Sequence, residues 1–123
     1  MTVKEIEQIA QEEFDRLPER FRENMENVSI VVDESPSRDQ LRRAGVRDGG
    51  LLLGLYEGVP LTRRDTGYGV YPVVPDRITL FKGPIEAIAR SRDDIRGKIR
   101  EVLIHEIAHY YGMGEEEIRS AGY

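Results

Sequence analysis

The strongest helical pattern in the sequence runs from Ser91 to Gly112, and it carries both of the chain's histidines. Asp94 follows Ser91 at a distance of three residues, which resembles a capping box at the start of a helix. Apolar residues then recur at helical spacing, and Gly112 stands where a helix would end. The pattern predicts one long helix, and the rest of the chain must pack around it.

Residues 105–109 of this predicted helix have the sequence HEIAH. Each residue turns a helix by about 100°, so His105 and His109 lie on one face, one turn apart, and can bind one Zn²⁺ together. Glu106 lies beside the pair, where a base must stand to take a proton from water in the same site. The chain has no cysteine, so any metal must be held by His, Asp or Glu. Two helix histidines are also compatible with an ordinary structural role.

Gly112 and Glu115 extend the motif to H-E-x-x-H-x-x-G-x-x-E, which resembles the metzincin motif, in which the eleventh residue is a third zinc ligand. The chain resembles a bacterial family of minimal zincin-like metallopeptidases more closely than it resembles the metzincins. That resemblance rests on three stretches, GLYEGVPLT (54–62), PDRITLFKGPIE (75–86) and HEIAHYYG (105–112). The resemblance covers about residues 51–118. It implies a zincin-like α+β fold and an enzyme that uses Zn²⁺ to hydrolyse peptide bonds.

The resemblance implies that His105, His109 and Glu115 hold the zinc ion and that Glu106 is the general base. The family usually has Asp at the eleventh position, and Glu115 keeps the carboxylate on a side chain one methylene longer. Zinc accepts an oxygen from either residue at about 2.0–2.2 Å. Glu116 is an alternative ligand. Residues 115–117 are also typical of the exposed, acidic first turn of a helix.

Peptide hydrolysis also needs a hydrogen-bond donor for the oxyanion that forms, and a side chain must form the floor of the site. The chain ends too soon after Glu115 for the Met-containing turn that lies beneath the metal in larger zincins. Tyrosines are the predicted residues for these two roles, and the sequence does not choose among them. They are Tyr68, Tyr71, Tyr110, Tyr111 and, as a terminal ring that folds back, Tyr123.

An extended substrate pairs with the edge strand of a sheet in the β-augmentation mode. The strand expected to offer this edge is formed by Arg77, Ile78, Thr79, Leu80 and Phe81. Residues 62–76 contain several glycines and prolines and are predicted to form a long loop that covers the cleft.

The remaining patterns complete one small α+β domain over residues 1–123, with a small mixed sheet packed on helices. Periodicity and turn residues predict five further helical segments and two further strands. The helices are expected at residues 3–17, just after Pro18, at 37–44 and just after Gly83, with a last short segment at 115–122, and the strands at 28–33 and 51–57.

The net charge of −5 offers no basic surface for nucleic acid. No apolar run approaches the ~20 residues of a membrane span, and the N-terminus lacks a signal-peptide pattern. We therefore expect a cytoplasmic protein with no nucleic-acid or membrane partner. The substrate that the zincin resemblance implies is a peptide or an unfolded protein segment. The oligomeric state stays open.

Two other functions are compatible with parts of the pattern. The first is a non-catalytic peptide- or metal-binding module that retains the zincin fold, although such a module has no need of Glu106 as a base. The second is a metal-dependent endoribonuclease, because one rRNA-maturation family has the spacing H-x₃-H-x₅-H. That family lacks a Glu after its first His, and the acidic charge disfavours RNA.

Overall fold

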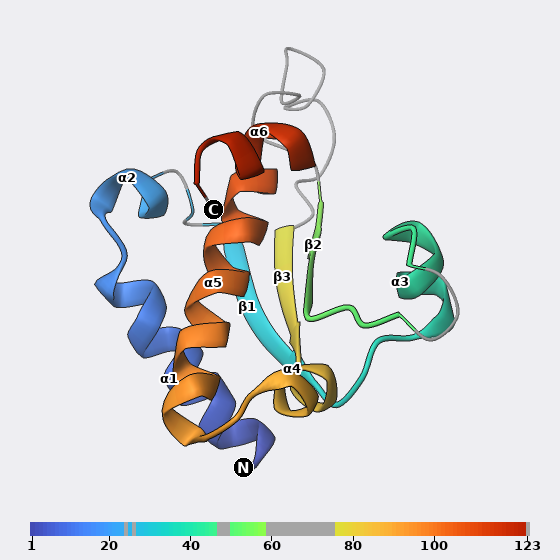
Figure 1. Ribbon diagram of the computed structural model, residues 1–123. Helices are drawn as coiled ribbons and strands as arrows, with labels where there is room; N and C mark the ends of the chain where they lie inside the picture. Colours follow the sequence, from blue (N-terminus) through green and yellow to red (C-terminus); the bar gives the residue numbers. More distant parts are fainter. Residues whose placement is uncertain (24, 26, 47–49, 59–75, 123) are drawn as a thin grey trace.

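The computed structural model describes residues 1–23, 25, 27–46, 50–58 and 76–122 (Figure 1). The described residues form a three-stranded sheet with helices packed around it, which confirms the predicted α+β class. In chain order the elements are α1 (Val3–Arg16), α2 (Glu19–Arg22), β1 (Val28–Asp33), α3 (Arg38–Arg43), β2 (Gly54–Glu57), β3 (Asp76–Phe81), α4 (Lys82–Ile88), α5 (Arg92–Tyr110) and α6 (Glu115–Ser120).

Local capping residues begin three of the helices. Thr2 caps α1 and Ser37 caps α3, each in a complete capping box. Ser91 caps α5, since its hydroxyl accepts the Asp94 N–H at 3.1 Å. In a capping box the Asp94 carboxylate would accept the backbone N–H of Ser91. Here it accepts the backbone N–H of Arg90 at 2.8 Å. Helix α5 therefore begins where the sequence predicts.

The three strands lie in the order β1-β3-β2. Strand β1 runs parallel to β3, and β2 runs antiparallel to it. This order corrects the predicted substrate strand, because β3 is central and its backbone groups are paired on both sides. The five residues concerned are Arg77, Ile78, Thr79, Leu80 and Phe81.

Burial explains why β3 is central. Four of its last five residues are buried, including neighbours that point to opposite faces of the sheet. A strand buried on both faces is typical of a sheet interior. Among the described strands, the short β2 is the edge that lies against the C-terminal half of α5 (Figure 1).

The core lies between the sheet and the pair α1 and α5. Ile78 of β3, Leu103 and Ile107 of α5 and Ile6 of α1 are all inaccessible to solvent. Figure 1 shows α1 beside the N-terminal half of α5, and the two helices are in contact. None of the described helices is long and apolar enough to cross a membrane.

Gly54 sets how closely β2 approaches α5. A Cβ atom at this position would lie 2.5 Å from Cγ1 of Val102 and 3.1 Å from the carbonyl oxygen of Thr79. We therefore expect Gly54→Ala to destabilise the fold by about 1–3 kcal/mol, because the helix and the strand must separate. Denaturant unfolding would measure the change.

Gly97 provides a matched control within α5. A Cβ atom there would have no neighbour within 4 Å. Gly97→Ala should stabilise the protein by up to ~1 kcal/mol, because Ala is the better helix former. A Gly54→Ala variant as stable as the wild type would show that the close approach of β2 to α5 is not a constraint.

Candidate metal centre and cleft

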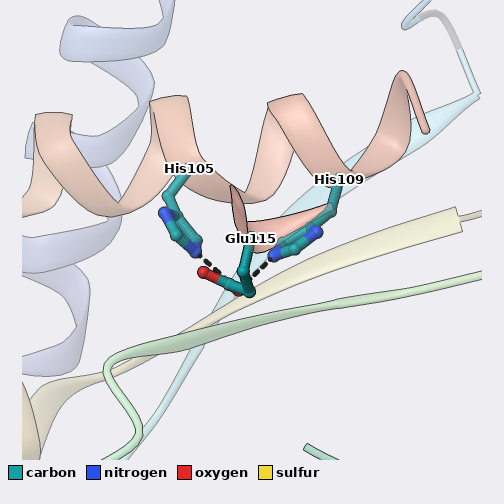
Figure 2. A group of neighbouring side chains, drawn as sticks. All are labelled: His105, His109 and Glu115. Carbon is teal, nitrogen blue, oxygen red and sulfur yellow. Dashed lines mark hydrogen bonds and ion pairs between the residues drawn. The ribbon is translucent and has the colours of Figure 1, made fainter. Parts of the chain in front are cut away.

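Three side chains from α5 and α6 converge on one point (Figure 2). His105 and His109 lie one turn apart on α5, with ring centroids 5.0 Å apart. Oε1 of Glu115 lies 3.0 Å from Nε2 of His105 and 2.8 Å from Nε2 of His109. In the part of the chain that the structure describes, this is the only group of three potential ligands whose atoms lie within 4.8 Å of one another.

A tight turn brings Glu115 back to the histidines. Helix α5 ends at Tyr110, and Gly112 takes a φ of +87°, a left-handed conformation that favours glycine. The N–H of Met113 then bonds the carbonyl of Ala108 at 3.0 Å. Helix α6 starts immediately afterwards at Glu115, so the predicted turn and the predicted third residue are both in place.

The second ring nitrogen of His109 defines its tautomer. Nδ1 lies 3.1 Å from the carbonyl oxygen of Met113, which can only accept a hydrogen bond. The proton of a neutral His109 must therefore be on Nδ1, and the lone pair of Nε2 points toward the shared centre. Metal-binding histidines are commonly oriented by a carbonyl in this way.

The three groups have the chemistry and nearly the spacing that zinc requires. Bonds of about 2.0–2.2 Å in a tetrahedron place ligand atoms roughly 3.3 Å apart. The two observed N···O distances of 3.0 and 2.8 Å are slightly shorter. The exposed side chain of Glu115 can move by the small difference, so the residues present fit a zinc ion.

The charge state of Glu115 suits this position. Burial by itself would raise the pKa of its carboxyl, but the hydrogen bonds and charges of His105 and His109 lower it below its ordinary value. The neighbouring acidic residues are placed differently. Glu117 accepts the N–H of Gly114 at 3.4 Å and caps α6, and Glu116 is not part of the group that Glu115 forms with the two histidines.

Glu106 lies on the inner side of the histidine pair, against the sheet. Its side chain is buried, with the residue 7% exposed, and Oε1 accepts the backbone N–H of Tyr56 on β2 at 2.8 Å. Burial raises the pKa of its carboxyl to about 7, although the charge of His109 and the Tyr56 N–H act to lower it. A carboxyl with a pKa near neutrality is suited to accept and return a proton.

A cleft of about 600 Å³ opens over these residues. One wall is formed by α5, the following turn and Glu115, and the other by β2 and its flanking residues. The lining residues are Ala44, Leu52, Gly54, Leu55, Tyr56, Gly58, His105, Glu106, His109, Gly112, Met113, Gly114 and Glu115.

An adjoining hollow of about 570 Å³ lies toward the N-terminal end of α5 and shares His105 and Glu106 with the cleft. Aliphatic side chains form much of its lining. The full set is Leu52, Leu53, Gly54, Glu101, Val102, Ile104, His105, Glu106 and Gly122.

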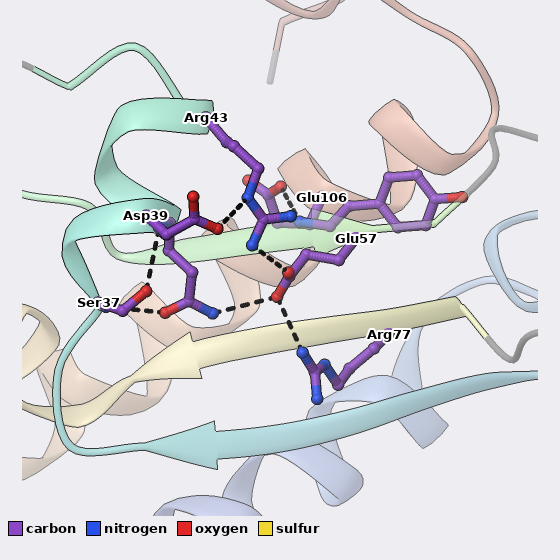
Figure 3. Close-up of polar contacts among 8 residues, drawn as sticks. Ser37, Asp39, Arg43, Glu57, Arg77 and Glu106 are labelled. Carbon is purple, nitrogen blue, oxygen red and sulfur yellow. Dashed lines mark hydrogen bonds and ion pairs between the residues drawn. The ribbon is translucent and has the colours of Figure 1, made fainter.

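Hydrogen bonds and ion pairs hold the end of β2 against α3 (Figure 3). The Glu57 carboxylate accepts hydrogen bonds from Gln40 at 3.1 Å, Arg43 at 2.9 Å and Arg77 at 3.2 Å. Burial opposes ionisation of Glu57, but these three donors outweigh it and lower its pKa. Arg43 also pairs with Asp39 at 2.9 Å. The edge strand is thus fixed beside the cleft.

Two of the tyrosines predicted for the site, Tyr110 and Tyr111, make other contacts in the structure. Tyr110 is 1% exposed and packs in the core, so its side chain faces the sheet and does not line the cleft. The hydroxyl of Tyr111 donates to the carbonyl of Glu23, which takes it away from the histidines. Helical geometry turns position 111 away from the face shared by 105 and 109. Tyr110 lies on the same side of α5 as Glu106, but its ring packs edge-on against Tyr56 in the core.

The other predicted residues lie outside the described part of the chain. These are Tyr68, Tyr71 and Tyr123, together with the predicted loop at 62–76 except for Asp76, which begins β3. Tyr56 is the site residue that the sequence analysis missed. It lies 50 positions from Glu106, and no local pattern could have paired the two.

Comparisons with known proteins bear on the family and the fold of this chain. A family model described as zincin-like metallopeptidase matches residues 25–123. Among solved structures, the fold is similar to that of a conserved hypothetical protein from Thermus thermophilus, with a TM-score of 0.59 and 18% sequence identity. The similarity covers 90% of this chain and 94% of that protein. No curated protein matches the chain.

The family match extends over most of the chain and includes the site helix, the turn at Gly112 and Glu115. The structural likeness, at 18% identity, bears on the fold alone. Together with the match, the three-stranded sheet and the motif-bearing helix confirm the predicted zincin-like fold. The chain belongs to the zincin-like metallopeptidase family.

Proposed function

We propose that this protein is a zinc-dependent peptidase that hydrolyses peptides or unfolded protein segments. The single observation that carries the proposal is the convergence of His105, His109 and Glu115 beside the buried Glu106 at the floor of an open cleft. A site that only held metal would have no use for a buried carboxyl fixed beside it by a backbone N–H.

The ligand residues and the base have separate tasks. His105, His109 and Glu115 would hold Zn²⁺, which supplies Lewis acidity to a carbonyl group and to water in the cleft. Glu106 takes a proton from the attacking water and returns it to the leaving amine. The bond from the Tyr56 N–H holds the Glu106 carboxylate while this happens.

The edge strand β2 is the surface on which a peptide would pair. The Phe81 N–H bonds the Leu53 carbonyl, so Leu53 and Phe81 form a hydrogen-bonded pair. In an antiparallel ladder such pairs alternate, and the backbone groups of Gly54 and Tyr56 therefore point away from β3 toward the cleft. The Tyr56 N–H already donates to Glu106, so the backbone groups of Gly54 would take the role that was predicted for β3.

The direction of β2 also orients the substrate. Gly54 lies against Val102 and Tyr56 lies against Glu106, so β2 and α5 run the same way. A peptide paired antiparallel to β2 would place the residues after the scissile bond toward Val102 and the adjoining hollow. The aliphatic side chains there favour substrates with an apolar residue on that side.

The test is metal content measured together with hydrolysis of an unstructured protein. We expect one zinc ion per chain, loss of hydrolysis on treatment with a chelator and recovery when zinc is added back. Hydrolysis that survives complete removal of metal would contradict the proposal. A zinc-loaded protein that binds peptides without cleaving them would instead be the non-catalytic module.

A further inference from the structure

Tyr56 contacts the site helix at two points and the sheet at a third. Its N–H donates to Glu106 at 2.8 Å, and its ring meets the ring of Tyr110 edge-on, with centroids 5.7 Å apart. Its hydroxyl donates to Oδ2 of Asp76 at 2.8 Å. Tyr110 follows Glu106 by four residues, so both project from the same side of α5 toward Tyr56.

The N–H of Tyr56 belongs to the open edge of β2. Residues 55 and 57 use their backbone groups to pair with β3, whereas those of Tyr56 point toward the cleft. The acceptor for this N–H is therefore a side chain, and it is the carboxylate of Glu106. A backbone donor on a paired strand has little freedom to move, so it orients the carboxylate that it binds.

Asp76 fixes the other end of Tyr56. This carboxylate is 1% exposed at the start of the central strand, and it accepts the Tyr56 hydroxyl. On its other side the backbone of Gly58 passes so closely that a Cβ there would lie 2.2 Å from Oδ1. The carboxylate is thus enclosed, and the tyrosine ring is held between Asp76 and Tyr110.

We propose that Tyr56 is the positioning residue for Glu106 and that Asp76 is its anchor. The inference rests on the proposed function, in which Glu106 transfers the proton. The hydroxyl bond to Asp76 holds the ring against α5, and the same residue then presents its N–H to Glu106. The strand that receives the substrate therefore also positions the base.

Tyr111 allows a matched test. Tyr56 and Tyr111 both meet the ring of Tyr110 edge-on, at 5.7 and 5.3 Å, and both donate their hydroxyl to an oxygen acceptor. Only Tyr56 is bonded to Glu106. Tyr56→Phe should lower kcat about tenfold to a hundredfold with little change in KM or zinc content, because a small misplacement of a reacting group is costly. Tyr111→Phe should leave kcat near the wild-type value.

Amide hydrogen exchange supplies a second measurement that needs no enzymatic activity. The N–H of residue 56 is expected to be protected in the wild type and to exchange about tenfold faster or more in Tyr56→Phe, with unfolding free energies compared alongside. In Tyr111→Phe the same amide should keep its protection. If the wild type cleaves no peptide, the proposed function fails, and this exchange still decides whether Tyr56 holds Glu106.

Three results would overturn the inference. One is a Tyr56→Phe variant with wild-type kcat. Another is an equal loss of kcat in Tyr56→Phe and Tyr111→Phe, which would indicate a general effect of lost tyrosine hydroxyls. The third is an amide at residue 56 that exchanges at the same rate with and without the Tyr56 hydroxyl.

Discussion

Glu106→Gln should reduce peptide hydrolysis by about 10²–10⁴-fold while the protein keeps its zinc. The amide is nearly the same size as the carboxylate, and its oxygen can still accept the N–H of Tyr56. It cannot take a proton from water at neutral pH. The loss should therefore fall mainly on kcat, and steady-state kinetics on one defined peptide would measure it.

Glu101→Gln is the matched control for this experiment. Glu101 lies on the same helix and borders the adjoining hollow, but its carboxylate is exposed and pairs with Lys98 at 3.7 Å. The same substitution there should change kcat little. A Glu106→Gln variant that retains wild-type kcat would remove Glu106 from the mechanism, even if zinc is present.

His109→Ala should abolish stoichiometric zinc binding. The substitution removes Nε2 from the shared centre and also the Nδ1 bond to Met113 that orients the ring. Loss of an outer-shell partner alone costs roughly 10–100-fold in affinity, and loss of the ligand itself should cost more. Competition with a chelator of known affinity would measure the change, and His105→Ala should behave in the same way.

The adjacent acidic residues test the third ligand separately. Glu115→Ala should weaken zinc binding strongly, because it removes the oxygen that lies 2.8–3.0 Å from both histidines. Glu116→Ala, one residue further along α6, should have little effect. Glu115→Asp should be tolerated, since a carboxylate is retained. Equal zinc affinity in the wild type and Glu115→Ala would exclude Glu115 as a ligand without affecting the histidine pair.

The proposal that a substrate pairs along β2 rests on the strand order, which the sequence did not provide. The clearest strand pattern, residues 77–81, is buried on both faces over 78–81 because β3 is the middle of the sheet. Strand β2 has only four residues, and its place at the edge of the described sheet depends on its pairing with β3 alone among the described strands. Order within a sheet is a property of contacts between distant segments, and periodicity within one strand carries no information about it.

The sequence by itself determined the features that depend on neighbours a few residues apart. These are the start of α5 at Ser91, the shared face of His105 and His109, and the turn at Gly112 that returns Glu115 to them. Helical rise, capping and glycine's freedom at positive φ act over a single turn, so the start of α5, the shared histidine face and the end of the helix follow from spacing. The return of Glu115 was expected from the resemblance to zincin motifs.

Only the tertiary structure decided what surrounds that motif. Packing of α5 on the sheet buried Tyr110 and turned it away from the cleft, and it brought the N–H of Tyr56 onto Glu106 from 50 residues away. It also enclosed Asp76 beneath the hydroxyl of Tyr56. Burial and the pKa it imposes on Glu106 arise from the assembled core. The metal-binding motif is therefore local, whereas the environment that would make its carboxylate a base is built by contacts between segments far apart in the chain.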